Sequence, residues 1–383
     1  MKLYIKGGKV FLPDNRTLHK TLVIEDQIIC DIIPNSYAPG NNDKVVDATD
    51  KWVVPGFIDI HAHGAMGKDT MDGSRDAIHT IGRFFAAHGV TSYLPTLLTS
   101  TPELMMKAID NVANCPQPED GARHLGVHVE GPYLNVKYRG AQIKELIRMP
   151  DPLEYRKWFD SGIVRLVTIA PENPGALEFI DKAVKQGVKF AIGHSGASYE
   201  QVVEAADHGL NQATHLFNGM LGLHHRKPGT AGGVLMDERI YAQIIADGVH
   251  VHPAIIKLSV RAKGISKIIL ITDSIRGAGL PDGYYDNYGQ QFTVKNGIAR
   301  TPMGGLSGST LTLNKAIKNM MKFASLPLND VLPMATSVPA EAMGWQDQRG
   351  VLKPGADADV VVLNEIFNVE KTFVLGNEVY SLL

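Results

Sequence analysis

Two histidines separated by one residue, His61 and His63, end the apolar segment VPGFIDIHAHG at residues 54–64. Side chains alternate between the two faces of a strand, so Asp59, His61 and His63 are expected to point the same way. A neutral imidazole is a common ligand for zinc and similar divalent ions, and two on one strand supply half of a chelate. An isolated pair is equally compatible with two ordinary buried or surface histidines. The rest of the chain has to distinguish a metal site from a structural pair.

Further histidines and carboxylates stand at or just beyond the ends of other strand-like segments. They are Glu130, His194, His215, His250 and Asp273. Each has a structural alternative on its own: His194 as a turn residue, Glu130 as a solvated loop carboxylate, Asp273 as a helix N-cap. Together with His61 and His63, they have the composition of a hydrolytic site that holds one or two metal ions.

The segments that carry these residues alternate with helical patterns. Residues 74–89 predict an amphipathic helix with Ser74 as its N-cap and Gly89 after its end. Eight segments predict strands: 53–63, 90–98, 124–132, 163–172, 188–195, 211–218, 241–250 and 267–274. Eight βα units in about 290 residues favour an α/β TIM barrel over a doubly wound sheet, whose glycine-rich dinucleotide loop is absent here. In such a barrel the polar residues lie on the C-terminal rim, where active sites of this fold are built.

Both chain ends have the pattern of short strands. Residues 2–13 predict a hairpin around Gly7–Gly8, residues 21–33 a second one, and residues 371–383 a third with Gly376–Asn377 at the turn. A short sheet needs a partner face, so the ends are expected to pair into one discontinuous β-sandwich domain, residues 1–52 and 355–383. The TIM-barrel catalytic domain would span residues 53–354, with a β-hairpin insertion near residues 277–309 as a candidate lid.

The composition of the 383 residues is that of a globular protein, and the formal net charge is -2 with charges of both signs interspersed. This pattern argues against a nucleic-acid or membrane partner. Cys30 and Cys115 lack the spacing of a thiolate metal site or a disulfide framework. Lys6 and Lys9 stand where a signal peptide needs its apolar region, and no run of about 18 apolar residues occurs. We therefore expect a reduced, cytoplasmic location.

An ordered set of motifs resembles the amidohydrolase superfamily and, within it, the family of N-acetylglucosamine-6-phosphate deacetylases. The motifs are PGFIDIHAHG, HVEGPYLN, IGHSGAS, THLFNGM, HHRKPG, IADGVHVHP and ITDS, and the match extends to GVLKPGADADVVVL near the C-terminus. The resemblance implies a metal-dependent TIM barrel that releases acetate from an N-acetylhexosamine 6-phosphate in amino-sugar catabolism. HHRKPG and GLPDGYY also resemble the N-acetylgalactosamine-6-phosphate branch. N-acetylglucosamine 6-phosphate is the first expectation and the galactosamine epimer the second.

The resemblance also implies the metal ligands. Glu130, His194 and His215 correspond to the residues that hold the one metal common to the family. Many members replace the pair at His61 and His63 with amides, whereas those that keep it bind two ions with the glutamate bridging. This chain has both histidines, so two ions per subunit are expected. Zinc is the first expectation, with iron, manganese and cobalt as alternatives that the same ligands accept.

Catalytic roles follow in the same way. Asp273 is implied as the general base that takes a proton from water and returns it to the departing amine, as a metal ligand, or as both. Gln142, in the loop after the Glu-Gly-Pro motif, occupies the place of a donor to the developing oxyanion. His128 shares the inward face with Glu130 and is expected to pack or support rather than to react.

The phosphate of the substrate needs cations and oriented donors. Arg226 offers a planar fork that matches phosphate oxygens, and His250 can donate a hydrogen bond. The resemblance places Asn218 and Gly219 beside the phosphate, and Leu306 lies in a glycine-containing stretch suited to close approach of a sugar. It also implies a homodimer, in which His224 and His225 reach the neighbouring subunit's site. The structural alternative for residues 224–229 is a solvated loop.

Two other functions stay open. One is another amidohydrolase reaction, such as cyclic-amide hydrolysis or deamination, in which Arg226 would bind a carboxylate. It is weakened because no strand-end lysine stands where carbamylated relatives carry their bridging group, and Glu130 takes that place. The other is a non-catalytic homologue that binds sugar phosphates. Loss of Asp273 or of a metal ligand would favour it, and the sequence keeps them all.

Overall fold

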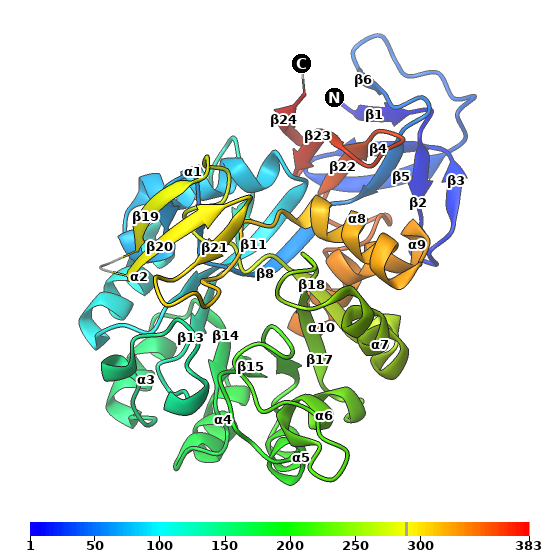
Figure 1. The fold of residues 1–383 in the computed structure, drawn as a ribbon. Helices are drawn as coiled ribbons and strands as arrows, with labels where there is room; N and C mark the ends of the chain where they lie inside the picture. Colours follow the sequence, from blue (N-terminus) through cyan, green and yellow to red (C-terminus); the bar gives the residue numbers. More distant parts are fainter. Residues whose placement is uncertain (288–289, 383) are drawn as a thin grey trace.

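The computed structural model describes residues 1–287 and 290–382. Tyr288 and Gly289 of the predicted insertion and Leu383 of the predicted C-terminal hairpin lie outside the described residues. Figure 1 shows a ring of strands surrounded by helices, with the strands of the two chain ends side by side next to it.

Eight parallel strands form the barrel, one in each predicted segment. They are β8 (Phe57–Ala62), β11 (Val90–Leu97), β13 (Val127–Glu130), β14 (Val164–Ile169), β15 (Lys189–Ile192), β16 (Gln212–Ala213), β17 (Tyr241–Ile245) and β18 (Ile268–Ile271). They pair in this order, and a short strand, β12 (Arg123–His124), adds to β11. Backbone hydrogen bonds from Asp273 N to His61 O (2.9 Å) and from His63 N to Ser274 O (2.8 Å) link the last strand to the first. The predicted α/β TIM barrel is confirmed.

One helix follows each barrel strand, and two more precede the C-terminal strands. The helices are α1 (Arg75–Ala86), α2 (Pro102–Asn114), α3 (Pro152–Asp160), α4 (Ala176–Val184), α5 (Tyr199–Asp207), α6 (Gly229–Met236), α7 (Pro253–Lys263), α8 (Leu313–Ala324), α9 (Leu328–Val331) and α10 (Ser337–Met343). Short 3-10 turns are η1 (Thr70–Asp72), η2 (Val136–Tyr138), η3 (Lys144–Leu146), η4 (Ile265–Lys267) and η5 (Leu332–Ala335). The predicted cap of α1 is confirmed, because Ser74 Oγ accepts a hydrogen bond from Ala77 N (3.3 Å). Within the described ranges, no helix combines the length and apolarity that crossing a membrane requires.

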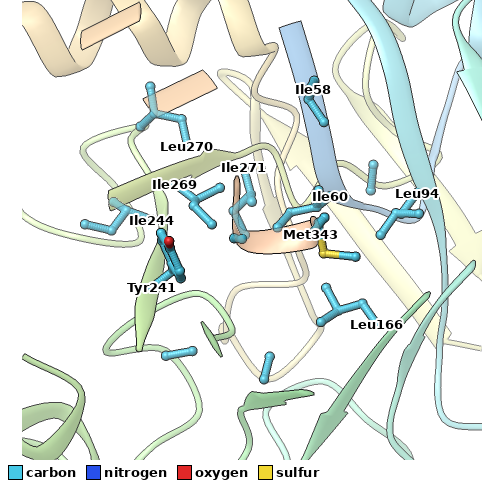
Figure 2. Close-up of a cluster of buried hydrophobic side chains, with 14 of the residues drawn as sticks. Ile58, Ile60, Leu94, Leu166, Tyr241, Ile244, Ile269, Leu270, Ile271 and Met343 are labelled. Carbon is cyan, nitrogen blue, oxygen red and sulfur yellow. The ribbon is translucent and has the colours of Figure 1, made fainter. Parts of the chain in front are cut away.

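Apolar side chains of the barrel strands and of α10 form a continuous core. Figure 2 shows part of it: Ile58, Ile60, Leu94, Leu166, Tyr241, Ile244, Ile269, Leu270, Ile271 and Met343. Complete burial of one such aliphatic side chain stabilises a fold by about 1.5–3 kcal/mol. Along β8 the core residues Ile58 and Ile60 alternate with the buried polar residues Asp59 and His61. The apolar half of the strand thus anchors the polar half that reaches the rim.

Strands from both chain ends form two further sheets. The first has the order β5-β4-β1-β6 and comprises β1 (Leu3–Lys6), β4 (Thr21–Glu25), β5 (Ile28–Ile33) and β6 (Lys44–Asp47). The second has the order β24-β23-β22-β7-β2-β3 and comprises β2 (Lys9–Phe11), β3 (Thr17–His19), β7 (Trp52–Pro55), β22 (Val360–Leu363), β23 (Val369–Val374) and β24 (Asn377–Ser381). One buried cluster includes Ile5 and Leu22 of the first sheet and Val53 and Phe373 of the second. The division of the chain into domains at residues 52 and 355 stays a prediction.

The strand β22 connects this cluster to the barrel. Val360 and Val362 pack in the cluster of the chain ends, whereas Val361 and Leu363 pack in the barrel core. A strand buried on both faces needs a continuous apolar run, which explains the sequence VVVL. The six-stranded sheet is therefore the layer through which the chain ends support the barrel.

The predicted hairpin around Gly7–Gly8 is wrong. The strands β1 and β2 flank these glycines but lie in different sheets, where β1 pairs with β4 and β6 and β2 pairs with β3 and β7. Gly7 has φ +84°, and a Cβ on Gly8 would lie 2.5 Å from Val53 Cγ2. The glycine pair therefore passes the chain from one sheet to the other at a close approach.

The other two predicted hairpins are confirmed as antiparallel neighbours, β4 with β5 and β23 with β24. The turn of the second one is displaced by one residue from its predicted position. Leu375 and Gly376 have positive φ values of 48° and 77°, and Asn377 already pairs with Val374. Positive φ at both central residues is the conformation that a tight two-residue turn requires.

An antiparallel insertion follows β18, where a hairpin is predicted. It has three strands, β19 (Gly283–Asn287), β20 (Gln290–Lys295) and β21 (Ile298–Arg300), which Figure 1 shows in yellow as a separate small sheet. Phe292, Val294 and Ala299 form its own buried cluster with Ile275. The chain returns to the rim at Ser309, whose N donates to Asp273 O (2.8 Å). A two-stranded ribbon of β9 (Gly64–Ala65) and β10 (Lys68–Asp69) follows β8.

Candidate metal centre and active site

Six side chains at the C-terminal rim bring potential ligand atoms together. They form two groups, His61 with His63 and Asp273, and Glu130 with His194 and His215, and in each group the ligand atoms lie within 4.8 Å of one another. All six residues are buried. We call them the six-residue cluster. The predicted convergence of strand ends has thus brought together residues that span more than 200 positions of the sequence.

Glu130 lies between the two groups. Its Oε1 is 3.1 Å from His194 Nε2 and 3.0 Å from His215 Nε2. Its Oε2 is 3.4 Å from His63 Nε2, and Oε1 is 3.6 Å from His61 Nε2. A carboxylate with both oxygens in contact with imidazole nitrogens of two groups has the arrangement of a bridging ligand.

Three members of the cluster have an uncommon backbone conformation. His194, His215 and Asp273 are each the second residue after their strand, with φ values of 48°, 32° and 49°. Non-glycine residues rarely adopt this region, which costs on the order of 1–3 kcal/mol each. Close packing helps to hold it: a Cβ on Gly193, just before His194, would lie 2.6 Å from Thr168 Cγ2. Such conformations concentrate at functional sites.

Backbone carbonyls set the tautomers of three of the histidines. His63 Nδ1 lies 3.2 Å from Thr96 O, His194 Nδ1 lies 2.9 Å from Tyr138 O, and His215 Nδ1 lies 3.1 Å from Asn218 O. A carbonyl can only accept a hydrogen bond, so Nδ1 carries a proton, and in the neutral ring the lone pair of Nε2 faces the cluster. This is the tautomer and the supporting contact that metal-ligating histidines show.

The charges of the cluster also fit a cation. Burial by itself raises the pKa of Glu130 and of Asp273, but the surrounding histidines hold both pKa values below the ordinary range. Burial lowers the pKa of His61 to about 4, so that ring is neutral. For His63, contacts with Asp273 and Glu130 outweigh burial and raise the pKa well above its usual value. The two carboxylates are therefore ionised in a buried site. Buried negative charge of this kind needs a compensating cation, and a divalent ion would supply it.

Gln142 contacts the cluster directly. Its Nε2 donates a hydrogen bond to Glu130 Oε2 (2.9 Å), and its Oε1 accepts one from Thr99 N (3.1 Å). The backbone donor fixes the orientation of the amide, because only the oxygen can accept. The amide N–H2 group therefore faces the cluster.

Two buried polar residues lie behind the cluster. His128 Nε2 is 2.7 Å from Thr168 Oγ1, and its ring packs edge-on against that of His61 with centroids 4.6 Å apart. Burial holds the pKa of His128 well below its ordinary value. Asp59 accepts hydrogen bonds from Thr272 Oγ1 (2.6 Å) and His61 N (3.2 Å), and burial raises its pKa to about 7. Both residues support the ring of His61 or its backbone.

A cavity of about 400 Å³ opens onto the cluster. This volume is in the range of small-molecule sites. Its lining includes five cluster members and, of the other predicted site residues, Gln142, Asn218, Gly219, His250 and Leu306. His250 is held by Asp247, whose Oδ2 lies 2.6 Å from His250 Nδ1 and whose Oδ1 accepts from His250 N (2.8 Å).

Arg226 and His225 lie elsewhere. Both are exposed, and Arg226 Nη1 lies 2.7 Å from His225 Nε2. Neither Arg226 nor His225 is among the described residues that line the cavity. The structure therefore does not bring Arg226, the predicted phosphate ligand, to the cavity of its own chain. His225, which the resemblance places at the neighbouring subunit's site, also lies outside this cavity.

Asn287, Gln290 and Thr301, in or next to the strands of the insertion, also line the cavity without having been predicted. The available signal was the position of the insertion directly after the strand that ends near Asp273. The contacts of the Thr96, Tyr138 and Asn218 carbonyls could not be predicted from the sequence, because every residue type carries the same backbone carbonyl.

The sequence profile of the amidohydrolase family matches residues 52–379. The chain belongs to this family. The site lies at the C-terminal rim of the barrel, where active sites of this fold are built, and its residue groups are compatible with a divalent metal ion.

Individual family members are similar over most of their length. The N-acetylglucosamine-6-phosphate deacetylase of Vibrio furnissii is 40% identical over 333 residues, which cover 86% of this chain and 83% of that protein. The N-acetylgalactosamine-6-phosphate deacetylase of Escherichia coli O157:H7 is 36% identical over 336 residues, 87% of this chain and 89% of that protein.

Solved amidohydrolase structures agree with the fold. The N-acetylglucosamine-6-phosphate deacetylase of Pasteurella multocida superposes with a TM-score of 0.93 at 29% identity, over 100% of both chains. A variant of the Mycobacterium smegmatis enzyme, in complex with N-acetyl-D-glucosamine-6-phosphate, gives a TM-score of 0.89 at 32% identity and covers 100% of this chain and 99% of that one.

Proposed function

We propose that this protein is a metal-dependent hydrolase that removes the N-acetyl group of an N-acetylhexosamine 6-phosphate in amino-sugar catabolism. The products are the amino sugar phosphate and acetate. The observation that carries the proposal is the buried cluster at the cavity floor, where carbonyls of Thr96, Tyr138 and Asn218 orient three imidazoles toward one carboxylate. The relatives named for both epimers support it, with N-acetylglucosamine 6-phosphate as the first choice.

The residues fit one or two divalent ions per subunit. Glu130, His194 and His215 would hold one ion, and His61, His63 and Asp273 would hold a second, with Glu130 shared. When bound, such ions lower the pKa of water and polarise a carbonyl group. Zinc is the metal that we propose first, and iron, manganese and cobalt accept the same ligands.

Asp273 is the proposed general base, and its carboxylate lines the cavity. The neighbouring histidines keep its pKa below the ordinary value against the effect of burial, so it is ionised near neutral pH. An ionised carboxylate at this place can take the proton of the attacking water and return it to the amine nitrogen as the C–N bond breaks.

Gln142 is the proposed donor to the oxyanion that develops on the acetyl carbonyl. Its amide is already oriented by Thr99 N, so no rearrangement is needed when the charge develops. Its contact with Glu130 keeps the N–H2 group beside the cluster.

The sugar phosphate would lie between the cluster and the opposite cavity wall. Asn218, Gly219 and His250 provide amide, backbone and imidazole groups for the phosphate, and Leu306 provides an apolar surface for the sugar. We also propose a homodimer in which His225, exposed outside the cavity of its own chain, reaches the neighbouring subunit's site, with Arg226 beside it as a phosphate contact there. The free thiols of Cys30 and Cys115 accord with a cytoplasmic location.

The decisive experiment is incubation of the metal-loaded protein with both N-acetylhexosamine 6-phosphates, with free acetate as the readout. We expect acetate from at least one epimer, and none from the unphosphorylated sugars at the same concentration. Metal analysis of the same sample establishes that the protein is loaded. Binding of the sugar phosphate without acetate would instead support a non-catalytic homologue. Ammonia release or ring opening of a cyclic amide, with no acetate, would support another amidohydrolase reaction.

A further inference from the structure

Glu172 is the third residue after β14, at the end of the segment IAPE. It lies outside the cavity lining but accepts three hydrogen bonds. Its Oε2 accepts from Ser195 Oγ (2.7 Å), and its Oε1 accepts from Gly196 N (2.5 Å) and from Asn135 Nδ2 (2.9 Å). These donors belong to two different loops, one after β13 and one after β15. A single carboxylate therefore joins the loops of three neighbouring strands.

Two of these hydrogen bonds, those from Ser195 and Gly196, hold the backbone next to His194. Ser195 and Gly196 directly follow His194, which has the left-handed φ of 48°. A non-glycine residue keeps this conformation only where the surrounding structure holds it. The two hydrogen bonds from Ser195 and Gly196 to Glu172 hold the chain immediately after this residue.

The third hydrogen bond, from Asn135 Nδ2, connects Glu172 to the carbonyl and the ring of His194 through Asn135 and Tyr138. Asn135, whose side chain Glu172 holds, donates from its N to His194 O (2.9 Å) and accepts at its O from Tyr138 N (2.9 Å). Tyr138 O in turn accepts from His194 Nδ1 (2.9 Å). Together with the covalent chain within Asn135, Tyr138 and His194–Ser195, these hydrogen bonds form a closed circuit. It starts and ends at Glu172 and includes both the backbone and the ring of His194.

We propose that Glu172 is a positioning residue that holds His194 in the geometry of a metal ligand and thereby sets the affinity of the site for its divalent ion. This inference rests on the metal-binding role of the six-residue cluster given under the proposed function. Contacts that orient a ligand from behind typically contribute a factor of about 10–100 to metal affinity or activity. The carboxylate acts through Ser195, Gly196 and Asn135 and does not itself touch the ion.

The test compares Glu172→Ala with Glu178→Ala. Glu178 lies six positions further along the chain, on the exposed face of α4, where its ion pair is with Lys182. The readout is the overall association constant for Zn²⁺, measured by competition with a chromophoric chelator. We expect a loss of about 10–100-fold for Glu172→Ala and none for Glu178→Ala. Excess Zn²⁺ should restore most of the acetate release of Glu172→Ala, because the missing contact lowers only the fraction of sites that hold the ion.

A purely structural role would give another result. In that case Glu172→Ala would lower the free energy of unfolding of the metal-free protein, and its Zn²⁺ affinity would stay within twofold of the Glu178→Ala control. That outcome would overturn the proposal. Glu172→Gln covers the case in which the alanine variant does not fold: it keeps the volume and one acceptor oxygen, and we expect a smaller but measurable loss of affinity. An unchanged Zn²⁺ affinity of folded Glu172→Gln would also contradict the proposal.

His194→Ala separates this inference from the proposed function. If His194→Ala loses Zn²⁺ affinity and the Glu172 variants do not, the metal centre stands and the positioning role fails. If His194→Ala also binds Zn²⁺ like the unaltered protein, the metal-binding role of the cluster itself is wrong.

Discussion

His63 Nε2 lies 3.2 Å from Asp273 Oδ1, across the line where the last barrel strand meets the first. The backbone hydrogen bond from Asp273 N to His61 O fixes the two segments at the same place. The proposed general base and half of the proposed second metal site therefore take their positions from barrel closure. Loss of the closing contacts would disturb both at once.

Replacement of Asp273 by asparagine tests its role as base. Asparagine keeps the shape and one oxygen ligand but cannot accept the proton from water. We expect acetate release to fall by roughly 10²–10⁴-fold while the metal content is largely retained. Turnover and elemental analysis on one preparation check this, with the exposed Asp160→Asn as the matched control. Near-normal turnover of Asp273→Asn would show that another group is the base.

The pair His61 and His63 is expected to decide how many ions are bound. A double variant, His61→Asn with His63→Gln, should bind one ion per chain instead of two, because Glu130, His194 and His215 still form a complete group. Metal stoichiometry after gel filtration provides the measurement, and exposed His19→Asn serves as the control. Loss of all metal from the double variant would refute this division between the two groups.

Gln142→Leu removes the amide and keeps an approximately similar volume. Loss of a single preorganised oxyanion donor costs about 10²–10³ in kcat, so we expect a fall of that size with unchanged metal stoichiometry. Steady-state kinetics of acetate release, beside the exposed Gln186→Leu, would test this. If the variant loses metal instead, the hydrogen bond to Glu130 is the main contribution of Gln142.

His124 predicts a pH dependence of stability away from the site. Its side chain is buried at β12, and burial lowers its pKa in the folded state. The unfolded chain takes up the proton near pH 6.5, whereas the folded one resists it. The associated stability is thus complete above about pH 6.5 and falls as the pH decreases below it.

His124→Gln should therefore lose less stability than the unaltered protein between pH 7.5 and pH 5, by at most about 2 kcal/mol. Urea unfolding of both proteins at the two pH values gives the difference, and any constant cost of the glutamine cancels in it. An equal loss of stability in both proteins would mean that His124 does not contribute to the acid sensitivity.

Much of the fold was predictable because it depends on local patterns. The helix Arg75–Ala86 with its cap Ser74, and the strand before His63, follow from side-chain periodicity and capping, which neighbouring residues determine. The rule that polar residues gather at the C-terminal rim then predicted the convergence of Glu130, His194, His215 and Asp273. The prediction of a hairpin around Gly7–Gly8 is wrong because β1 pairs with β6 and β2 pairs with β7, and both of these partners are distant in the sequence.

The sequence by itself determined the residue types of the site and the strands that carry them, since both are local properties of the chain. Only the tertiary structure decided which carbonyls orient His63, His194 and His215, and that Arg226 lies outside its own cavity. It also placed Glu172 against the loops around His194. These contacts join segments that are far apart in the chain, and barrel closure and loop backbone geometry set them without any signal in residue spacing.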